Sequence, residues 1–405
     1  MKVYSWLQWS LLITLPNVVT AQDSLVERVE SLEARNLHLV QALDSLSLEL
    51  ERLQLNAPSP VSAAGEGQTH GVTLGGYGEA VFTDASGSGN RTTDFLRNVL
   101  YAGYQFDDVW RFNSEIEFEH ASTDKAGSAS VEFAYLEYQR SEALAFRAGL
   151  LLAPIGFINE MHEPTTYLGA SRPVTESRII PTTWRENGVG ILGQTDEFQY
   201  RLSLLTGLDA TGFDESGLRG GRQKGSKSKA EDLALAARLD WVGHPGLLAG
   251  VSVYAGQSDQ GQAGLGSVDT HLVDLHAQYE WNAWRFRGLL TSAHVGNTEE
   301  LFVASGADAT VVGKRQDGYY LEAGYDLFHH SDGAGSRSLR AFVRFEELDT
   351  HASVSSALTE DPNQRETIQT IGLQWSPVEN VVFKIDYQDF DRAADQVHVS
   401  LGYAF

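Results

Sequence analysis

Three arginines lie in a segment of this 405-residue chain that departs from ordinary exposed-loop composition. Segment 154–187 holds Arg172, Arg178 and Arg185 among large apolar residues and several prolines. A guanidinium group offers a rigid fork of N–H donors that can bind an oxyanion, and a low local dielectric strengthens this attraction. The apolar residues and prolines predict that the segment packs against another surface. The three arginines are therefore candidate ligands for an anion.

Further cations lie at the polar positions of segments in which apolar and polar residues alternate. Five of them join the candidate anion ligands: Arg97, Arg111, Arg147, Arg285 and Arg287. Other cations share this parity: Arg201, Arg238, Arg340, Arg344 and Lys384. Carboxylates do so too: Glu79, Glu115, Glu117, Glu119, Asp240, Asp274, Glu280, Glu322, Asp326, Glu346 and Asp386. Because both signs occur, many of these charges have the alternative role of pairing across strands, and the preference for anions or cations stays open.

A basic run, LRGGRQKGSKSK, occupies residues 218–229 and contains Arg219, Arg222 and Lys224. Glycine, serine and lysine in such a run are typical of a solvated, mobile loop. The alternative is that the run attracts anions to a pore mouth or binds the phosphates of lipopolysaccharide.

Catalytic chemistry finds little support in the sequence. The chain has no cysteine, which excludes disulfides, thiol catalysis and cysteine-ligated metals. His276, His294 and His351 are scattered and no G-x-S-x-G motif is present, so an outer-membrane protease or lipase is a weak alternative. His329 and His330 have no further ligand at local spacing. We expect no catalytic residues, no metal site and no cofactor.

The elements that carry these residues are predicted by hydrophobic periodicity. From residue 72 onward, sixteen segments have the period of two that is typical of strands. They are 72–83, 95–106, 109–120, 129–140, 144–153, 187–194, 198–207, 232–242, 247–256, 270–281, 284–294, 317–328, 338–348, 366–376, 380–389 and 395–405. Short and long connections alternate between them. An even number of strands with this alternation predicts an all-β, antiparallel transmembrane barrel.

Side-chain parity assigns the two faces of the predicted strands. In the last segment Val397, Val399 and Leu401 share one face, whereas His398 and Ser400 share the other. We expect the apolar face to contact lipid and the polar face to line a lumen, since a barrel of sixteen strands is wide enough for an aqueous channel.

Tryptophan positions give an independent indication of a membrane interface. Of the eight tryptophans, Trp110, Trp241, Trp281, Trp284 and Trp375 lie close to predicted short connections. Such aromatic girdles mark a membrane interface and place the short turns in the periplasm. The alternative, a soluble β-sandwich, leaves this coincidence unexplained.

The N-terminal part of the chain has a different organisation. Residues 1–21 have the charge, apolar stretch and small residues of a secretory signal peptide. Residues 22–55 contain a heptad repeat in which Leu25, Leu32, Leu39 and Leu46 occupy one seam position. This repeat predicts a periplasmic coiled coil of two or three chains, although a single amphipathic helix packed on another surface is the alternative. Residues 56–71 read as a linker.

Several stretches resemble the phosphate-selective porin O and P family of Gram-negative bacteria. They are LGGYGEAVF (74–82), RAGLLLAPIGFINEMHEPTTYLG (147–169), SRIIPTTWRENGVGILG (177–193) and the terminal LGYAF. The resemblance implies a homotrimeric, sixteen-stranded outer-membrane porin with a periplasmic coiled coil. It also implies that the loop 154–187 folds into the lumen and narrows it.

The sequence therefore predicts a non-enzymatic porin in the outer membrane, through which small hydrophilic solutes diffuse, with anions such as phosphate as expected solutes. Its expected partners are copies of itself, outer-membrane lipid, lipopolysaccharide and peptidoglycan. A net charge of −24 at pH 7 argues against nucleic acid. The alternative function is a structural one, in which the coiled coil tethers the outer membrane to the cell wall.

Overall fold

The computed structural model describes residues 71–86, 91–121, 127–306, 310–329 and 336–405. The predicted signal peptide and coiled coil lie outside these residues, as does the linker apart from Gly71. No helix within the described ranges is long and apolar enough to cross a membrane.

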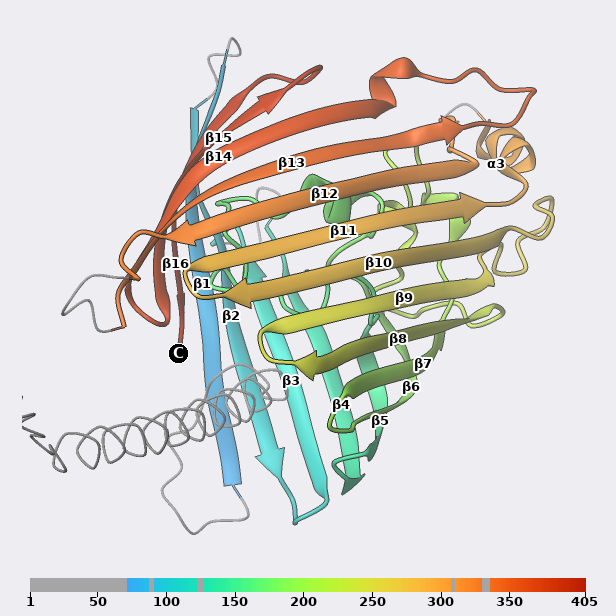
Figure 1. The fold of residues 1–405 in the computed structure, drawn as a ribbon. Helices are drawn as coiled ribbons and strands as arrows, with labels where there is room; N and C mark the ends of the chain where they lie inside the picture. Colours follow the sequence, from blue (N-terminus) through green and yellow to red (C-terminus); the bar gives the residue numbers. More distant parts are fainter. Residues whose placement is uncertain (1–70, 87–90, 122–126, 307–309, 330–335) are drawn as a thin grey trace, which may run out of the picture. The chain divides into compact units, whose positions relative to one another are not determined.

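Sixteen antiparallel strands close into a barrel in which every strand pairs with its neighbours in sequence, and β1 pairs with β16 (Figure 1). The strands are β1 (Gly71–Ala85), β2 (Arg91–Gln105), β3 (Trp110–Glu119), β4 (Ala129–Ser141), β5 (Leu144–Leu152), β6 (Arg185–Gln194), β7 (Phe198–Thr206), β8 (Leu233–His244), β9 (Leu247–Gln257), β10 (Asp269–Trp281), β11 (Trp284–Val295), β12 (Arg315–Asp326), β13 (Ser338–Ser353), β14 (Arg365–Val378), β15 (Val381–Phe390) and β16 (Gln396–Ala404). The predicted all-β barrel of sixteen strands is confirmed.

Short turns and long loops alternate along the chain, as predicted. Two residues connect β10 to β11, whereas the loop from β11 to β12 contains helix α3 (Thr298–Ser305) at the other end of the strands (Figure 1). Further short helices lie in other long loops: α2 (Val174–Arg178), η1 (Ala210–Gly212), η2 (Arg219–Gly221) and η4 (Pro362–Gln364). Trp281 and Trp284 flank the β10–β11 turn and are both exposed on the outer face.

The outer face of the barrel is apolar and the inner face is polar. On β12, Leu321 is 63% exposed, whereas the following Glu322 is 5% exposed. On β16, Val399 and Leu401 are exposed, while His398 and Ser400 are buried. Period two thus separates a lipid-facing surface from a lumenal surface that holds the charges.

A β-bulge interrupts this parity in β4. Glu115 on β3 lies opposite Phe133 and Ile116 lies opposite Val131, so Glu132 has no partner in the ladder. An extra residue in one strand re-aims its side chain. Glu132 and Glu137 are consequently both fully buried, although they are five positions apart in the strand and unbroken alternation would place them on opposite faces.

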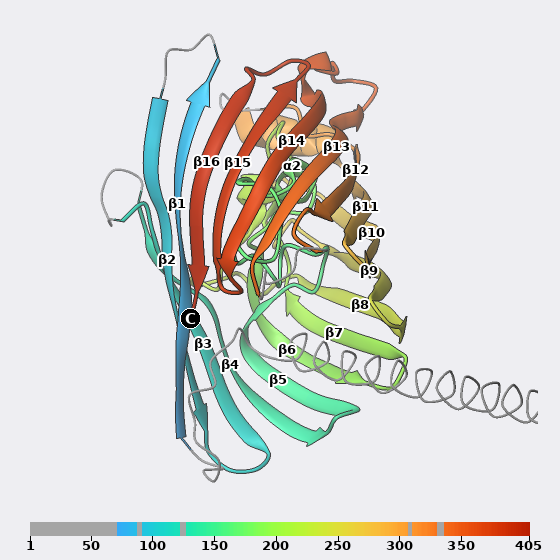
Figure 2. The ribbon, with the colours of Figure 1, turned by 60° about the vertical axis from the view of Figure 1, so that its left-hand side comes forward.

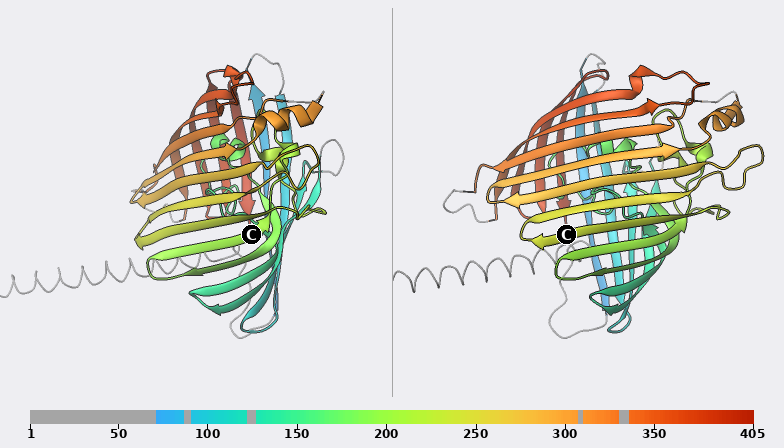
Figure 3. Two further views of the ribbon diagram at one scale, coloured as in Figure 1. Left: turned by 90° about the vertical axis from the view of Figure 1, so that its right-hand side faces the viewer. Right: turned by 45° about the vertical axis from the view of Figure 1, so that its right-hand side comes forward.

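The connection between β5 and β6, here called the inward loop (153–184), runs inside the ring of strands. Figure 2 shows α2 enclosed by the barrel, and both views in Figure 3 show strands around the green loop segments. Ile155, Phe157, Ile179 and Trp184 are each at most 2% exposed, because they pack with apolar residues of the wall and of the neighbouring loop. The strand β6 begins at Arg185, so the loop is shorter than the expected segment 154–187.

Candidate functional site

The inward loop is organised around one of its own carboxylates. Glu176 Oε2 accepts hydrogen bonds from the backbone N–H groups of Phe157 and Ile158, each at 2.8 Å. Tyr320 on β12 donates its hydroxyl to Oε1 at 2.6 Å. Burial raises the pKa of Glu176, and the backbone hydrogen bond from Ile158 partly offsets this increase. This carboxyl group therefore joins the first part of the loop to α2 and fixes both to β12.

Charged residues of β13 and β15 hold one side of the loop. Lys384 Nζ donates to the carbonyl oxygens of Tyr167 and Gly169, both at 2.8 Å. The carboxylate of Glu346 accepts from the backbone N–H of Thr175 at 3.0 Å. Both lumenal side chains are almost fully buried, so these contacts satisfy polar groups of the loop backbone in the interior of the barrel.

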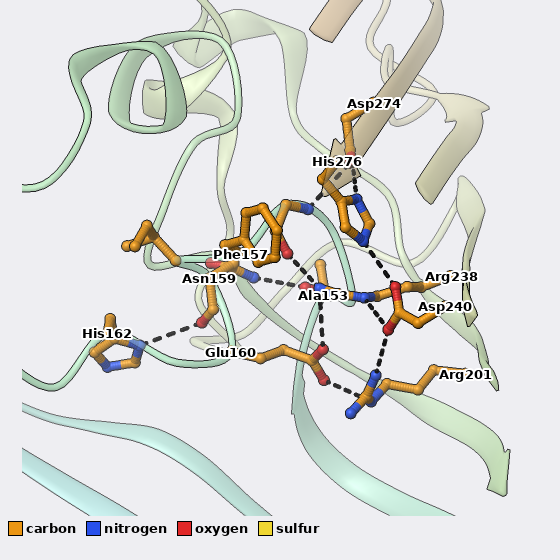
Figure 4. Close-up of polar contacts among 12 residues, drawn as sticks. Ala153, Phe157, Asn159, Glu160, His162, Arg201, Arg238, Asp240, Asp274 and His276 are labelled. Carbon is orange, nitrogen blue, oxygen red and sulfur yellow. Dashed lines mark hydrogen bonds and ion pairs between the residues drawn. The ribbon is translucent and has the colours of Figure 1, made fainter. Parts of the chain in front are cut away.

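The side of the loop near Gly156 is held by β8 and β10 (Figure 4). Arg238 donates to the carbonyl oxygen of Gly156 and is paired with Asp240 at 2.7 Å. The N–H of Gly156 donates to Asp274 at 3.0 Å. His276 lies between these carboxylates, with Nδ1 2.5 Å from Asp274 and Nε2 2.7 Å from Asp240. Both ring nitrogens are thereby engaged, and neither is left to activate a nucleophile.

Four of the predicted anion ligands have partners within the wall or in the inward loop. Arg147 Nε lies 2.5 Å and Arg111 Nε 2.6 Å from the buried carboxylate of Glu137. Arg285 Nε donates to Glu280 at 2.6 Å, and Arg287 donates to Gln278 and to the carbonyl oxygen of Thr166. These arginines brace the wall or anchor the inward loop, which corresponds to the alternative role considered above.

Three of the other predicted ligands, Arg97, Arg172 and Arg185, take part in a group of cations from four segments. We define the basic cluster as Arg97 on β2, Arg172 on the inward loop, Arg185 on β6, and three residues of the loop between β7 and β8, namely Arg219, Arg222 and Lys224. Arg172 and Arg97 both repel the charge of Arg219, and Arg185 repels those of Arg222 and Lys224. The arginines from the two loops and the wall thus lie within electrostatic reach of one another.

The pKa values in the β7–β8 loop reflect this concentration of positive charge. Burial and the neighbouring charges of Arg219 and Arg185 lower the pKa of Arg222 to about 9. Burial, followed by Arg222 and Arg185, lowers the pKa of Lys224. Arg222 nevertheless stays protonated at neutral pH, and an anion that enters the basic cluster would relieve the repulsion.

Carboxylates lie behind the basic cluster and are less accessible than its cations. Arg97 pairs with Glu79 at 3.5 Å and with Glu117 at 3.8 Å, and Arg185 lies 3.7 Å from Glu132. These carboxylates are at most 3% exposed. By contrast, Arg219 and Lys224 are exposed, and Arg172 and Arg222 are half-buried. Arg172, Arg219, Arg222 and Lys224 are therefore more accessible than these three carboxylates, although Glu119, which acts on Arg219 and Lys224, is half-buried as well.

The β7–β8 loop was expected to be solvated and mobile, and no pattern in the sequence indicated that it is attached to neighbouring segments. Arg222 donates to the carbonyl oxygen of Thr183 at 2.7 Å, and the N–H of Gln223 donates to Glu186 at 2.8 Å. The loop is thus attached to the end of the inward loop. Composition alone could identify its charge but not this attachment.

The remaining predicted ligand, Arg178, lies at the end of α2. It has no ion-pair partner among the residues that the structure describes and is half-buried.

The closed barrel with a loop folded into it is the fold of Gram-negative outer-membrane porins. An anion-selective porin from Comamonas acidovorans is 12% identical with a TM-score of 0.54, over 83% of this chain and 100% of that one. OmpF of Salmonella typhi is 13% identical, with a TM-score of 0.55 over 83% and 98% of the chains. The trimer form of OmpT, an outer-membrane protein of Vibrio cholerae, is 10% identical, with a TM-score of 0.53 over 84% and 100%.

Sequence comparison gives the narrower relationship. An uncharacterized protein of Aquifex aeolicus (strain VF5) is 34% identical over 331 residues, which are 78% of this chain and 75% of that protein. The chain belongs to the same family as this protein. No family model matches the chain.

Proposed function

We propose that this protein is a porin of the Gram-negative outer membrane through which small hydrophilic solutes diffuse passively, with a preference for anions such as phosphate. The barrel supports this by its apolar outer face, charged lumen and inward loop. Passive diffusion needs no chemical step. The ring nitrogens of His276 are both bonded to carboxylates, Asp240 and Asp274, which is consistent with the absence of such a step.

One observation carries the preference for anions: the basic cluster combines cations of the inward loop, the wall and the β7–β8 loop. A selectivity filter requires that one sign of charge dominate at the level where the solute passes. Arg172, Arg219, Arg222 and Lys224 are more exposed than the carboxylates behind them. A low-dielectric wall focuses their field into the lumen, which raises the local concentration of anions.

The overall charge of −24 does not oppose this proposal. Many acidic residues are neutralised within the wall, as in the pairing of Glu137 with Arg111 and Arg147. Ions in the lumen respond to charges within about one Debye length, which is about 8 Å at physiological ionic strength. The local arrangement therefore determines selectivity more than the sum over the chain does.

The reversal potential in a KCl gradient, measured on the purified protein in planar bilayers, tests the proposal. We expect the wild type to prefer chloride, and added phosphate to reduce the chloride current. The triple variant Arg219→Gln, Arg222→Gln, Lys224→Gln should move the reversal potential toward cation preference and weaken the phosphate effect.

Lys227→Gln is the matched control, because it removes one positive charge from the same loop outside the basic cluster. It should leave the reversal potential close to that of the wild type. A cation-selective wild type, or a triple variant indistinguishable from the control, would refute the preference for anions. A protein that inserts and conducts no ions would refute the channel.

A trimer and an N-terminal tether are further parts of the proposal. The heptad leucines Leu25, Leu32, Leu39 and Leu46 support self-association in the periplasm, and the trimer form of the Vibrio cholerae protein shows that this fold can form trimers. Deletion of residues 22–55 distinguishes the roles. A channel would keep its conductance, whereas loss of envelope integrity on deletion would support attachment to peptidoglycan.

A further inference from the structure

A second cluster of ligating side chains lies where the inward loop meets β3 and β4. His162 comes from the loop, Glu115 from β3 and Glu132 from β4. Their nearest nitrogen and oxygen atoms all lie within 4.8 Å of one another, and the three residues are at most 2% exposed. This cluster shares no residue with the basic cluster but adjoins it, because Arg185 lies 3.7 Å from Glu132 and Arg172 donates to the carbonyl oxygen of His162 at 3.3 Å.

The hydrogen bonds of His162 orient its ring toward the two carboxylates. Nδ1 lies 3.2 Å from the carbonyl oxygen of Asn159, so this nitrogen carries a hydrogen and donates it (Figure 4). Nε2 then faces Glu132 Oε2 at 2.8 Å and Glu115 Oε1 at 3.6 Å. Histidines that bind metals commonly donate their other N–H to a backbone carbonyl in this way.

Glu132 provides a second, independent observation. Its Oε1 atom is buried and has no hydrogen-bond partner within the described part of the chain, and the nearest cation is Arg185 NH1 at 3.7 Å. The β-bulge turns this side chain inward, out of step with the rest of β4. A buried carboxylate oxygen with unsatisfied hydrogen-bonding capacity is costly, and a bound cation would satisfy it.

We propose that Glu115, Glu132 and His162 bind a divalent transition-metal ion of the zinc class. Two carboxylate oxygens and one imidazole nitrogen are a ligand set that zinc accepts, with a fourth position for water. Ligand atoms around a four-coordinate zinc ion lie roughly 3.4 Å apart, between the two distances measured from His162 Nε2. Calcium and magnesium prefer ligand sets made only of oxygen, so the imidazole disfavours them.

His276 shows what distinguishes the proposed site from an ordinary ionic contact. It too lies between two carboxylates, but Asp274 and Asp240 bind opposite ring nitrogens. One ion cannot reach both carboxylates and the ring there. In the proposed site both carboxylates face the same nitrogen, and this convergence allows one ion to be shared.

A proton is the competitor of the metal at this site. Burial disfavours a charged imidazole, but the charge of Glu132 and hydrogen bonds with both glutamates outweigh burial and raise the pKa of His162 to about 10. Zinc would replace this proton and connect the inward loop to β3 and β4 by three bonds. The ion would thus fix one side of the constriction.

Equilibrium dialysis of the chelator-treated, refolded full-length protein against zinc chloride, followed by elemental analysis, tests the proposal. We expect one zinc ion per chain in the wild type. His162→Ala and the nearly isosteric Glu115→Gln and Glu132→Gln should reduce bound zinc to background. His276→Asn, which removes the other imidazole flanked by two carboxylates, should retain it.

Each outcome decides the proposal. A wild type that binds no zinc would show that the cluster is a protonated histidine held by two glutamates, and would overturn it. Zinc retained by the His162 and glutamate variants would place the ion elsewhere and also overturn it. If His162→Ala does not fold, the two glutamine variants, which keep the size of the side chain, give the result. Anion selectivity is measured in a separate experiment, the reversal potential. A failure of the proposed anion preference therefore does not affect the zinc-binding test.

Discussion

Lys384 places its ammonium group 3.9 Å from the ring centroid of Tyr167 and 2.8 Å from the carbonyl oxygen of the same residue. The hydroxyl of Tyr167 donates to Glu79 on β1 at 3.1 Å. Since β1 and β15 are the two strands that flank β16, one loop residue joins both sides of the closing strand. The position of the inward loop is therefore coupled to the closure of the barrel.

Lys384→Met is expected to loosen the inward loop. The change keeps the length of the side chain but removes two hydrogen bonds and the cation–π contact. Each buried carbonyl left without a partner costs about 1–3 kcal/mol. Single-channel recordings should show larger and noisier conductance than in the wild type. Arg365→Gln, which breaks an exposed pair with Glu347, is the control and should leave the current unchanged. Equal conductance in both variants would contradict the anchoring role.

Glu176→Ala is expected to expose the inward loop to protease. The substitution leaves the N–H groups of Phe157 and Ile158 and the hydroxyl of Tyr320 without their acceptor. Trypsin should then cut after Arg178 in the folded barrel, which peptide mass analysis can detect; the bond after Arg172 precedes Pro173 and stays resistant. Glu347→Gln serves as a matched control at the surface. A loop that stays resistant in Glu176→Ala would show that apolar packing alone holds it.

Anion preference is expected to decline at alkaline pH. Burial and the neighbouring arginines lower the pKa of Lys224 below its usual 10.5, so this cation loses its charge earlier than a free lysine does as pH rises. As pH rises, the positive charge of the basic cluster therefore decreases sooner than that of free side chains would, and Arg222, with its pKa lowered to about 9, adds to the decrease. Reversal potentials between about pH 7 and about pH 9.5 measure the effect. Lys224→Arg should decline less, and an identical decline in that variant would exclude Lys224 as its source.

Leu321→Arg is expected to destabilise the barrel in lipid. Leu321 is exposed on the outer face of β12, and arginine at the midplane of a bilayer costs about 2–4 kcal/mol in a transmembrane barrel. Leu327→Arg, in the turn after β12, should cost about 0–1 kcal/mol because the interface is hydrated. Denaturant unfolding from lipid vesicles measures both. Equal effects would argue against a depth-dependent lipid environment.

The strands could be predicted because each carries its own signal. In β10, exposed Leu275 and buried His276 follow the period of two, and Trp281 marks the end of the strand beside a short turn. Alternation and the tryptophan beside a turn are local patterns, formed by residues close together in the sequence, so they can be recognised without the structure. Strand pairing also follows from sequence order, because every strand pairs with its neighbours in the chain and only the β1–β16 contact joins strands far apart in sequence.

The site was less predictable because its contacts join residues far apart in sequence. Parity correctly placed Arg111 and Arg147 on the lumenal face but could not show that both bind Glu137. The bulge at Glu132 breaks the parity on which the prediction relied, so this carboxylate was missed. The link between Arg222 and Thr183 depends on how two loops fold against each other, which no local pattern encodes.

The inward loop follows β5 in the chain, yet Asp274, Glu346 and Lys384, which hold it, belong to β10, β13 and β15. The loop can reach all of these partners only when β10, β13 and β15 have joined the sheet, so its final docking follows most of the strand pairing. An incomplete barrel that lacks these strands consequently leaves the inward loop without three of its anchors.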